Sequence, residues 1–554
     1  MIGSGAGAGP VIYELSKAGF SVLVLEKGPW LMTEDFVKDE ISATRRSVYF
    51  PNLRDEQHVL ETPDADGKWI ARPTYETGRD FWNGNMVGGS SNLMSGYFHR
   101  MKPQDFRLFS QYGPVSGSNV TDWPISYEDM EPFFSKVEEI IGVSGRVDPH
   151  STMEPRSTDD FPYPPLAENV ASQWLDQAAE SLGYSMVPVP RAILSQPEGH
   201  RKSCYYSNYC GSYGCASDAK GSARVALIDK ALQSGHCTVK ANSKVFRLQT
   251  NGKHKVERAW YYDNYGDQQF AEAKLFVVAA QAVETARLLL MSDNREFPDG
   301  LANNSGQVGK NMIFSAGGTG SGQFFYDDLP ADVVNQLKVP GLFVNRAIQH
   351  WYEIDDEAFS GKVKGGTIDF LFEHANGIGK AIRRKWDENG KLRYGSALKE
   401  ELKNYFTGLR RLRFEVFADW QPNDNCFVTL DKRVRDRWGD PVAKIRLGYL
   451  DHDLKIGRFL ADRAVEVMEK MGARNISSSV SGTPPPNLQA GGCRFGNDPA
   501  TSVLDKHCKA HEVENLYITD GSFMPTGGSV TYTWTIYANA FRVAEHIKDH
   551  AGGG

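Results

Sequence analysis

The sequence predicts a mixed α/β protein (α+β overall) with two domains, and three observations support this prediction. A glycine-rich turn near the start of the chain leads into a helix-period segment and then a short apolar strand. Residues 411–417 and 426–430 alternate apolar and polar side chains, as strands do. The 554 residues exceed what one hydrophobic core usually holds. We therefore expect a Rossmann-like domain and a second domain built on an antiparallel sheet.

The opening turn has the pattern G-x-G-x-x-A, made by Gly3, Gly5 and Ala8. Gly3 permits a tight turn, Gly5 lets the backbone approach a diphosphate, and Ala8 lets the following helix pack closely on its strand. The next strand, 21–25, ends at Glu26, whose carboxylate can accept hydrogen bonds from an adenosine ribose. We predict a dinucleotide site. The alternative, an ordinary strand-turn-helix corner, does not require the acid.

Only two residues precede this turn, where a buried strand of four or five is usual. The sequence leaves open a truncated chain, a late start or a shortened first strand. After the turn, residues 29–79 are polar and irregular, and we expect them to wrap the surface.

Composition excludes several classes of protein. A net charge of −7 and a pI near 6.1 argue against a nucleic-acid partner, which needs a basic face. We expect no transmembrane segment, because the most apolar stretch, 275–291, is interrupted by polar and charged residues. The N-terminus does not have the pattern of a signal peptide, so the sequence alone predicts a cytoplasmic location. Seven cysteines in this length are not a disulfide framework.

A second glycine-rich stretch, 82–92, contains the run V-G-G-S-S. Gly88, Gly89 and Ser90 offer bare backbone amides and a small hydroxyl, which suit the lining of a diphosphate or a flat ring. As structure alone, the stretch is a glycine-rich loop that enters a helix.

These motifs together resemble the glucose-methanol-choline (GMC) family of FAD oxidoreductases. Residues 515–526 are similar to that family's last strand and flavin-contacting turn, 535–547 to its closing helix, and 276–289 to a strand-turn-helix of its FAD domain. Within the family, the sequence looks most like the large subunits of gluconate, fructose and FAD-dependent glucose dehydrogenases. The resemblance covers nearly the whole chain.

The resemblance implies a discontinuous FAD domain of residues 1–110, 195–320 and 480–554, and a substrate domain of 111–194 and 321–479. In the substrate domain, 450–471 has the pattern of an amphipathic helix that ends at Gly472. The residues that we expect to bind FAD, without a covalent bond, are Gly3, Gly5, Ala8, Glu26, Gly88, Gly89, Ser90, Asn92, Val245, Asp520 and Gly521.

The catalytic positions depart from the family pattern. The family places a His in H-x-x-G-T-x-R-M-G and an Asn or second His in P-T-x-G-x-x-N-x-T, and these positions are Leu488 and Thr531 here. Leucine cannot carry a proton, and the loss of a positioned base removes about 10²–10⁴ in rate. Another residue can serve as the base, the substrate can carry its own acidity, or the chain has lost alcohol oxidation. The candidates are Gln489, Thr531, Tyr532, His511 and, more weakly, His507.

Three cysteines, Cys204, Cys210 and Cys215, lie within a segment, 202–220, that we interpret as a cysteine-rich insertion. Zinc normally takes four ligands, and no fourth is nearby. Three thiolates suit an iron–sulfur cluster with an open corner, and the resembling glucose dehydrogenase subunits carry a 3Fe-4S cluster on comparably spaced cysteines. The alternative is three reduced thiols in a tight loop.

The resemblance therefore implies an FAD-dependent dehydrogenase that oxidises a hydroxyl of a sugar, sugar acid or polyol. With a cluster, electrons pass to a protein acceptor such as a cytochrome c. Related large subunits travel with a signal-bearing small subunit, so the implied location becomes periplasmic if the chain is exported in that way. The alternatives are an oxidase or lyase on the same fold, and a flavin-binding homologue whose chemistry has decayed.

Overall fold

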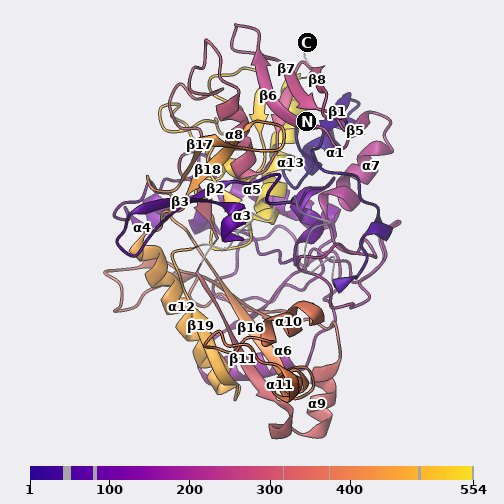
Figure 1. Ribbon diagram of the computed structural model, residues 1–554, viewed down its shortest axis with the longest axis vertical. Coiled ribbons are helices and arrows are strands. Elements are labelled where there is room, and N and C mark those ends of the chain that lie inside the picture. The colour runs from indigo at the N-terminus through magenta and orange to yellow at the C-terminus, as the bar shows by residue number, and fades with distance from the viewer. Residues whose placement is uncertain (41–51, 79–83, 316, 374, 484–487, 552–554) are drawn as a thin grey trace.

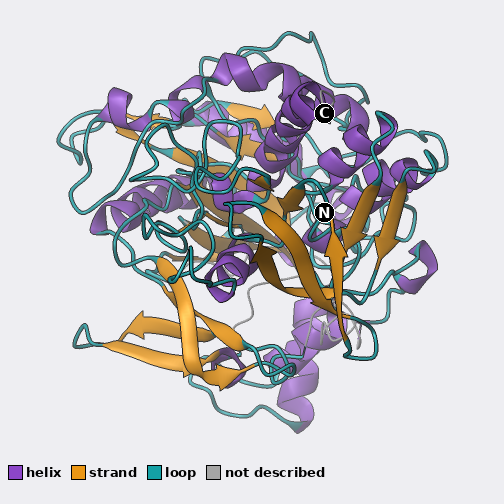
Figure 2. Ribbon diagram, turned by 90° about the horizontal axis from the view of Figure 1, so that it is seen from above, coloured by secondary structure: helices purple, strands orange, loops and turns teal. Residues whose placement is uncertain are grey.

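The structure is a computed structural model that describes residues 1–40, 52–78, 84–315, 317–373, 375–483 and 488–551. Trp82 and Asn83, part of the second glycine-rich stretch, lie outside these ranges, as does part of 29–79. Figure 1 shows both ends of the chain in the upper half of the molecule and the long helix α12 with strands β11, β16 and β19 in the lower half. Seen from above, helices lie around the central strands (Figure 2).

A parallel sheet forms the centre of the upper half. β1 (Val22–Leu25) pairs in parallel with β5 (Cys237–Lys240), and β9 (Phe276–Val278) with β21 (Leu516–Ile518). Ile2 joins the two pairs, because it forms parallel bridges to both Leu25 and Val278. The turn after Ile2 leads into α1 (Gly9–Lys17), which packs against α13 (Tyr532–Ala551). This arrangement confirms the Rossmann-like prediction.

A six-stranded antiparallel sheet dominates the lower half, which confirms the second part of the fold prediction. Its strand order is β19-β11-β16-β15-β12-β4. The bounds are Arg474–Ser479 (β19), Gly318–Phe325 (β11), Leu409–Ala418 (β16), Gly366–Phe372 (β15), Arg346–Ile348 (β12) and Met186–Pro188 (β4). The predicted amphipathic helix is α12 (Asp451–Lys470), and its apolar side chains share a core with those of β15 and β16. The domain boundaries themselves stay a prediction.

A four-stranded sheet differs from expectation. It has the order β17-β18-β2-β3, with β17 at Phe427–Arg435, β18 at Pro441–Arg446, β2 at Val59–Pro63 and β3 at Trp69–Pro73. The stretch 29–79, which we expected to be irregular, therefore supplies a hairpin to this sheet. The second alternating segment, 426–430, is a strand, but it pairs with β18 and not with the first segment, which lies in β16. Alternation fixes a strand's faces but not its partner.

The other elements connect these sheets. A three-stranded sheet consists of β6 (Lys244–Thr250), β7 (Val256–Tyr262) and β8 (Gln268–Glu272). Among the described residues, the other α-helices are α3 (Thr74–Thr77), α4 (Leu108–Tyr112), α5 (Tyr127–Ile141), α6 (Ala171–Ser181), α7 (Asp229–Leu232), α8 (Ala282–Met291), α9 (Ala331–Lys338), α10 (Gly377–Arg384) and α11 (Gly395–Thr407). The short strands there are β10 (Ile313–Phe314), β13 (Glu353–Ile354), β14 (Val363–Lys364) and β20 (Gln489–Ala490). Within the described ranges, no helix has the length and apolar character needed to cross a bilayer.

Candidate active site

A cavity of about 850 Å³ brings together residues that are far apart in the sequence. Its volume lies in the range of small-molecule and cofactor sites. The glycine-rich turn, the second glycine-rich loop, the start of α8 and the C-terminal segment form one part of the wall, and strand β16 forms another. Among the predicted FAD-binding residues, those that line it are Gly3, Gly5, Glu26, Gly89, Ser90, Val245, Asp520 and Gly521. Ala8, Gly88 and Asn92 do not line it.

The first turn has the geometry that a diphosphate needs. Gly3 has a φ of +87°, and a Cβ there would lie 2.3 Å from the carbonyl oxygen of Ala279, so only glycine fits. A Cβ at Gly5 would meet nothing closer than 4.0 Å and would enter the cavity. The first turn of α1 has no side-chain cap, so the positive end of the helix dipole is open to an anion, although the Gly9 amide donates to the Gly5 carbonyl (2.9 Å) and Pro10 carries no N–H.

Glu26 connects the first turn with the second glycine-rich loop. Its carboxylate accepts hydrogen bonds from the Ser4 hydroxyl (2.5 Å) and the Gly28 amide (2.8 Å). The Ser4 hydroxyl in turn accepts from the Gly88 amide (3.0 Å). Burial raises the pKa of Glu26, and the two donors to its carboxylate oppose that rise. The acid at the end of β1 thus lies on the cavity wall, where an adenosine ribose needs an acceptor.

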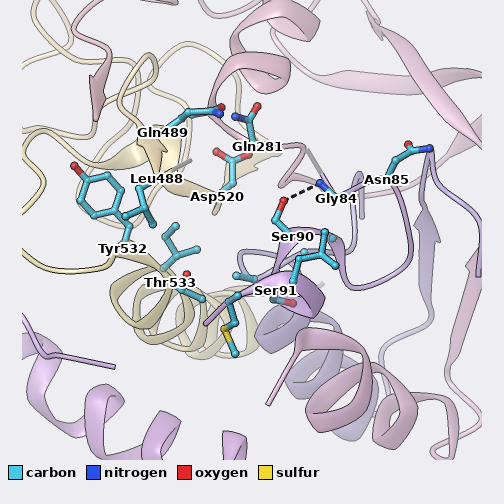
Figure 3. Close-up of a pocket in the computed structure, with 18 of the residues that line it drawn as sticks. Gly84, Asn85, Ser90, Ser91, Gln281, Leu488, Gln489, Asp520, Tyr532 and Thr533 are labelled. Atoms are coloured by element: carbon cyan, nitrogen blue, oxygen red, sulfur yellow. Dashed lines mark hydrogen bonds between the residues drawn. The ribbon is translucent and has the colours of Figure 1, made fainter. Parts of the chain in front are cut away.

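The second loop is held in shape by its own hydrogen bonds. The Gly84 amide donates to the Ser90 hydroxyl (2.9 Å), as Figure 3 shows. The Asn92 amide group donates to the carbonyls of Val87 (2.9 Å) and Gly89 (3.0 Å). Asn92 therefore supports the loop from behind and does not line the cavity. A Cβ at Gly89, whose φ is +57°, would lie 3.1 Å from Gly5 Cα, so the two glycine turns approach each other closely.

Asp520 lines the cavity and lies between Gln281 and Ser90 in the view of Figure 3. It accepts hydrogen bonds from the Thr285 hydroxyl and from the Ser522 amide (2.9 Å). Gln281 precedes α8 with a φ of +82°, which is rare for a residue with a side chain, and caps that helix by accepting from its first amides. Figure 3 shows the Gln281 and Gln489 side chains next to one another, above Asp520.

The predicted catalytic candidates do not all reach the cavity. Gln489 and Thr531 line it, and the Thr531 hydroxyl donates to the Tyr97 carbonyl (3.0 Å). Tyr532 also lines it, but its hydroxyl is buried next to Gly527, and in Figure 3 the ring points away from Asp520. His511 does not line the cavity.

The two histidines named from the sequence belong to other environments. The His511 ring lies 3.0 Å from the Ser502 hydroxyl. The His507 ring stacks on that of His546, with centroids 3.9 Å apart. Both are therefore engaged away from the residues that bound the cavity.

Sequence reasoning missed the residues on the sheet side of the cavity. Arg413, Glu415 and Phe417 extend from β16, and Lys380 from α10. Their even-numbered neighbours in β16 pack in the core with α12, so the odd-numbered ones face the cavity. The alternation over 411–417 was visible in the sequence, but it did not show which face meets a ligand.

The three cysteines of the insertion are free, half-buried thiols. Burial raises the pKa of Cys204 to about 12, so this thiol is protonated at neutral pH. Across the described ranges, no group of three or more His, Cys, Asp or Glu side chains is placed to hold a metal ion. The iron–sulfur prediction is therefore not supported.

The insertion instead supports the cavity wall. The buried ammonium of Lys220 donates to the carbonyls of Asn92 (3.3 Å), Cys210 (3.0 Å) and Tyr213 (2.9 Å). It thereby ties the insertion to the second glycine-rich loop, and Tyr213 lines the cavity.

Fold and site together define a protein with a Rossmann-like, dinucleotide-binding type of domain whose cavity is also bounded by a six-stranded antiparallel sheet. Comparisons with known proteins specify the family: family models described as GMC oxidoreductase match residues 70–314 and 422–540, more than half of the sequence. The chain therefore belongs to the GMC oxidoreductases, as its motifs predicted.

Similar proteins match over nearly the full chain. The 2-methyl-1,2-propanediol dehydrogenase of Mycolicibacterium austroafricanum is 29% identical over 566 residues, covering 99% of this chain and 94% of that protein. The fructose dehydrogenase large subunit of Gluconobacter japonicus is 26% identical over 573 residues, covering 99% and 97%. The structure of pyridoxine 4-oxidase from Mesorbium loti has the same fold, with a TM-score of 0.60, 17% identity and coverage of 99% and 98%.

The chain is accordingly an FAD-dependent oxidoreductase that acts on CH–OH donors. The residues present fit FAD. Gly5 has no side chain to block a diphosphate, α1 begins without a side-chain cap, and both Gly5 and the carboxylate of Glu26 line the cavity.

Proposed function

We propose that the protein is a dehydrogenase that oxidises a hydroxyl group of a sugar, sugar acid or polyol and passes the electrons to a protein or dye acceptor. The observation that supports this proposal is the shared cavity, where the nucleotide-binding turns face a polar surface made by Arg413, Glu415 and Lys380. Side chains of both charges can hydrogen-bond several hydroxyl groups of one substrate.

When bound, FAD supplies a two-electron acceptor for the hydride that leaves the substrate carbon. The chain's own residues hold the cofactor and orient the substrate. Arg413 and Glu415, two residues apart on β16, can each bind a hydroxyl on the cavity side of the sheet. Phe417 offers an apolar surface beside them for a C–H face.

An anaerobic reduction experiment tests this proposal. The FAD-loaded protein is mixed with 2-methyl-1,2-propanediol, D-fructose, D-gluconate or a panel of other polyols, and the long-wavelength flavin band is followed. We expect bleaching with at least one sugar, sugar acid or polyol. A protein that keeps its FAD, is bleached by dithionite and yet reacts with no hydroxyl donor would be a decayed homologue, the reading that Leu488 and Thr531 favour.

The electron acceptor separates a dehydrogenase from an oxidase. After reduction by substrate, the protein is exposed either to oxygen or to a dye acceptor under argon. We expect fast reoxidation by the dye and slow reoxidation by oxygen. Fast formation of hydrogen peroxide would instead identify an oxidase.

A small subunit and a cytochrome c acceptor are further proposals, supported by the relative that is named a large subunit. Co-expression with a candidate small subunit that carries a signal peptide, followed by co-purification, tests the small-subunit proposal. Recovery of the complex from the periplasm tests the periplasmic location. Iron and sulfide analysis of anaerobically purified protein tests the 3Fe-4S cluster separately, and less than one iron per chain contradicts it.

A further inference from the structure

The cavity lacks the family's usual base. The two family positions carry Leu488 and Thr531, neither of which can take a proton at neutral pH. No histidine within the described ranges lines the cavity. A positioned base raises the rate of hydroxyl oxidation about 10²–10⁴-fold, and a carboxylate on the cavity wall can replace the imidazole in this role.

Five carboxylates line the cavity: Glu26, Glu284, Glu373, Glu415 and Asp520. Four of them are fixed by hydrogen bonds. Glu26 and Asp520 each accept from a hydroxyl and a backbone amide, Glu284 contacts His58 at 2.7 Å, and Glu373 accepts from the Tyr405 hydroxyl at 2.7 Å. Glu415 forms an ion pair with Arg413 (3.7 Å) and has no hydrogen bond within the described part of the chain. Its carboxylate is therefore free to accept one from a substrate.

The position of Glu415 is set by the sheet. It lies in register with Asp369 of β15 and with Thr319 of β11, near the middle of the six-stranded sheet. Its side chain is 35% exposed and that of Arg413 34% exposed, while the alternate residues of β16 are in the core. Burial raises the pKa of Glu415; Arg413 and Arg191 oppose that rise, and Asp369 adds to it. These are the charged groups that act on the carboxyl.

Tyr97 supplies a hydrogen-bond donor to the same cavity. It is 6% exposed and lines the cavity, yet its hydroxyl finds no acceptor among the described residues. The Arg191 guanidinium covers the ring at 3.9 Å from its centroid and fixes its plane. Burial raises the pKa of Tyr97 well above its usual value, so the group stays a donor. Thr531, at the family's Asn position, holds the Tyr97 carbonyl.

We propose that Glu415 is the catalytic base of the oxidation and that the Tyr97 hydroxyl binds a substrate oxygen. The substrate would lose a proton and a hydride, which together are two protons and two electrons: the hydroxyl proton would pass to the Glu415 carboxylate, bound FAD would accept the hydride, and the C–O single bond would become a carbonyl. The protonated Glu415 side chain then releases its proton to solvent through the cavity. This inference rests on the proposed function. Glu415 would take the role that the histidine has in the family.

A first test needs no substrate. A carboxylate in the flavin cavity changes the absorbance of bound FAD when it ionises, so the visible spectrum of the FAD-loaded protein is titrated with acid and base. We expect a one-proton change in the wild type that is absent in Glu415→Gln. Glu257→Gln, an exposed change on β7, should titrate as the wild type does. Identical titrations of the wild type and Glu415→Gln would overturn the placement of Glu415 beside the flavin.

A second test measures flavin reduction under anaerobic conditions with the polyol that reacts best. Glu415→Gln should reduce the rate constant about 10²–10⁴-fold while substrate binding, measured by calorimetry, changes less than about tenfold. In the wild type, kcat/KM should fall at acidic pH because the Glu415 carboxylate becomes protonated, and this fall should be absent in Glu415→Gln. Tyr97→Phe should raise KM about tenfold with kcat nearly unchanged, because it removes one hydrogen bond and keeps the ring.

The outcomes separate the two proposals. A wild type that no donor reduces contradicts the proposed function, and the spectral titration then still decides the placement of Glu415. A wild type that is reduced, with a Glu415→Gln variant reduced as fast, leaves the function intact and overturns the catalytic role. A Glu415→Gln variant that loses only affinity would make Glu415 a substrate-binding residue, which also overturns it.

Discussion

Leu488, which stands at the family's histidine position, has an unusual backbone conformation. Its φ of +58° lies in the left-handed region, which an apolar residue with a Cβ rarely adopts. It also precedes β20, which pairs with β10 beside the cavity. Leu488 lines the cavity, but leucine cannot exchange a proton. Thr531, at the family's asparagine position, has a structural role, because its hydroxyl donates to the Tyr97 carbonyl.

Glu26→Gln should weaken FAD binding about 10- to 100-fold. The change removes the negative charge that accepts from Ser4 and that we expect to accept from the ribose, and a hydrogen bond to a charged group is worth about 1.5–3 kcal/mol. Titration of the apoprotein with FAD, followed by flavin fluorescence, measures the dissociation constant. Glu128→Gln, an exposed change on α5, is the control. Equal affinities in the wild type and Glu26→Gln would contradict the assignment of Glu26 to the adenosine end.

At the scale of elements, the strand-turn-α1 unit distinguishes two glycine roles. Gly3→Ala forces a Cβ to within 2.3 Å of the Ala279 carbonyl oxygen at a φ of +87°, so we expect a loss of about 3 kcal/mol or more in the free energy of unfolding. Gly5→Ala meets nothing within 4.0 Å, so the protein should fold normally. Its methyl group would instead enter the diphosphate position and weaken FAD binding. Denaturant unfolding measures the loss of stability, and FAD titration measures the loss of affinity. Equal stabilities and equal FAD affinities of the two variants would contradict the different roles of Gly3 and Gly5.

Helix α13 carries a pH-dependent contact on its outer surface. The His546 ring lies between those of His507 (3.9 Å) and His550 (4.1 Å), and burial together with these neighbours lowers the pKa of His546 to about 4. The unfolded chain therefore binds more protons than the folded chain between about pH 6.5 and pH 4, and stability falls as the pH falls through that window.

His546→Gln should make the protein less sensitive to acid. We expect the decrease in Tm between pH 7 and pH 5 to be smaller in this variant than in the wild type, because the variant has no imidazole to protonate at that position. His236→Gln, at an exposed residue before β5, should keep the wild-type decrease. A His546→Gln variant with an unchanged decrease in Tm would show that the stack contributes nothing.

The sequence allowed prediction of elements whose signals are local. The turn at Gly3 and Gly5, the acid at Glu26 and the helix that ends before Gly472 each depend on neighbouring residues, and the structure places them as expected. The partner of β17 and the hairpin of β2 and β3 were not predictable, because strand pairing is decided by contacts between distant segments. Glu415 was missed for the same reason, since only the folded sheet shows which face of β16 meets the cavity.

At the scale of the whole molecule, the site depends on the contact between two cores. One core surrounds the parallel sheet, and the other lies between α12 and the six-stranded sheet. Asp419, just after β16, joins the substrate sheet to the C-terminal turn. Its carboxylate accepts from the amides of Gly527 (3.1 Å) and Gly528 (2.7 Å) and from the Ser529 hydroxyl (3.2 Å). This turn leads directly to Thr531, so Asp419 sets the distance between the two walls of the cavity.

Asp419→Ala should therefore disturb both stability and the site. It leaves two buried amides without their acceptor, whereas the Ser529 hydroxyl can still donate to the Gly365 carbonyl (2.9 Å), and we expect the free energy of unfolding to fall by about 3 kcal/mol. Asp419→Asn keeps one carbonyl oxygen that can accept from both amides, so the expected loss is only about 1 kcal/mol. Denaturant unfolding gives both values, and anaerobic flavin reduction should be slowed more by alanine than by asparagine. Equal losses in the two variants would mean that the charge of Asp419, and not its role as an acceptor for the turn, holds the two cores together.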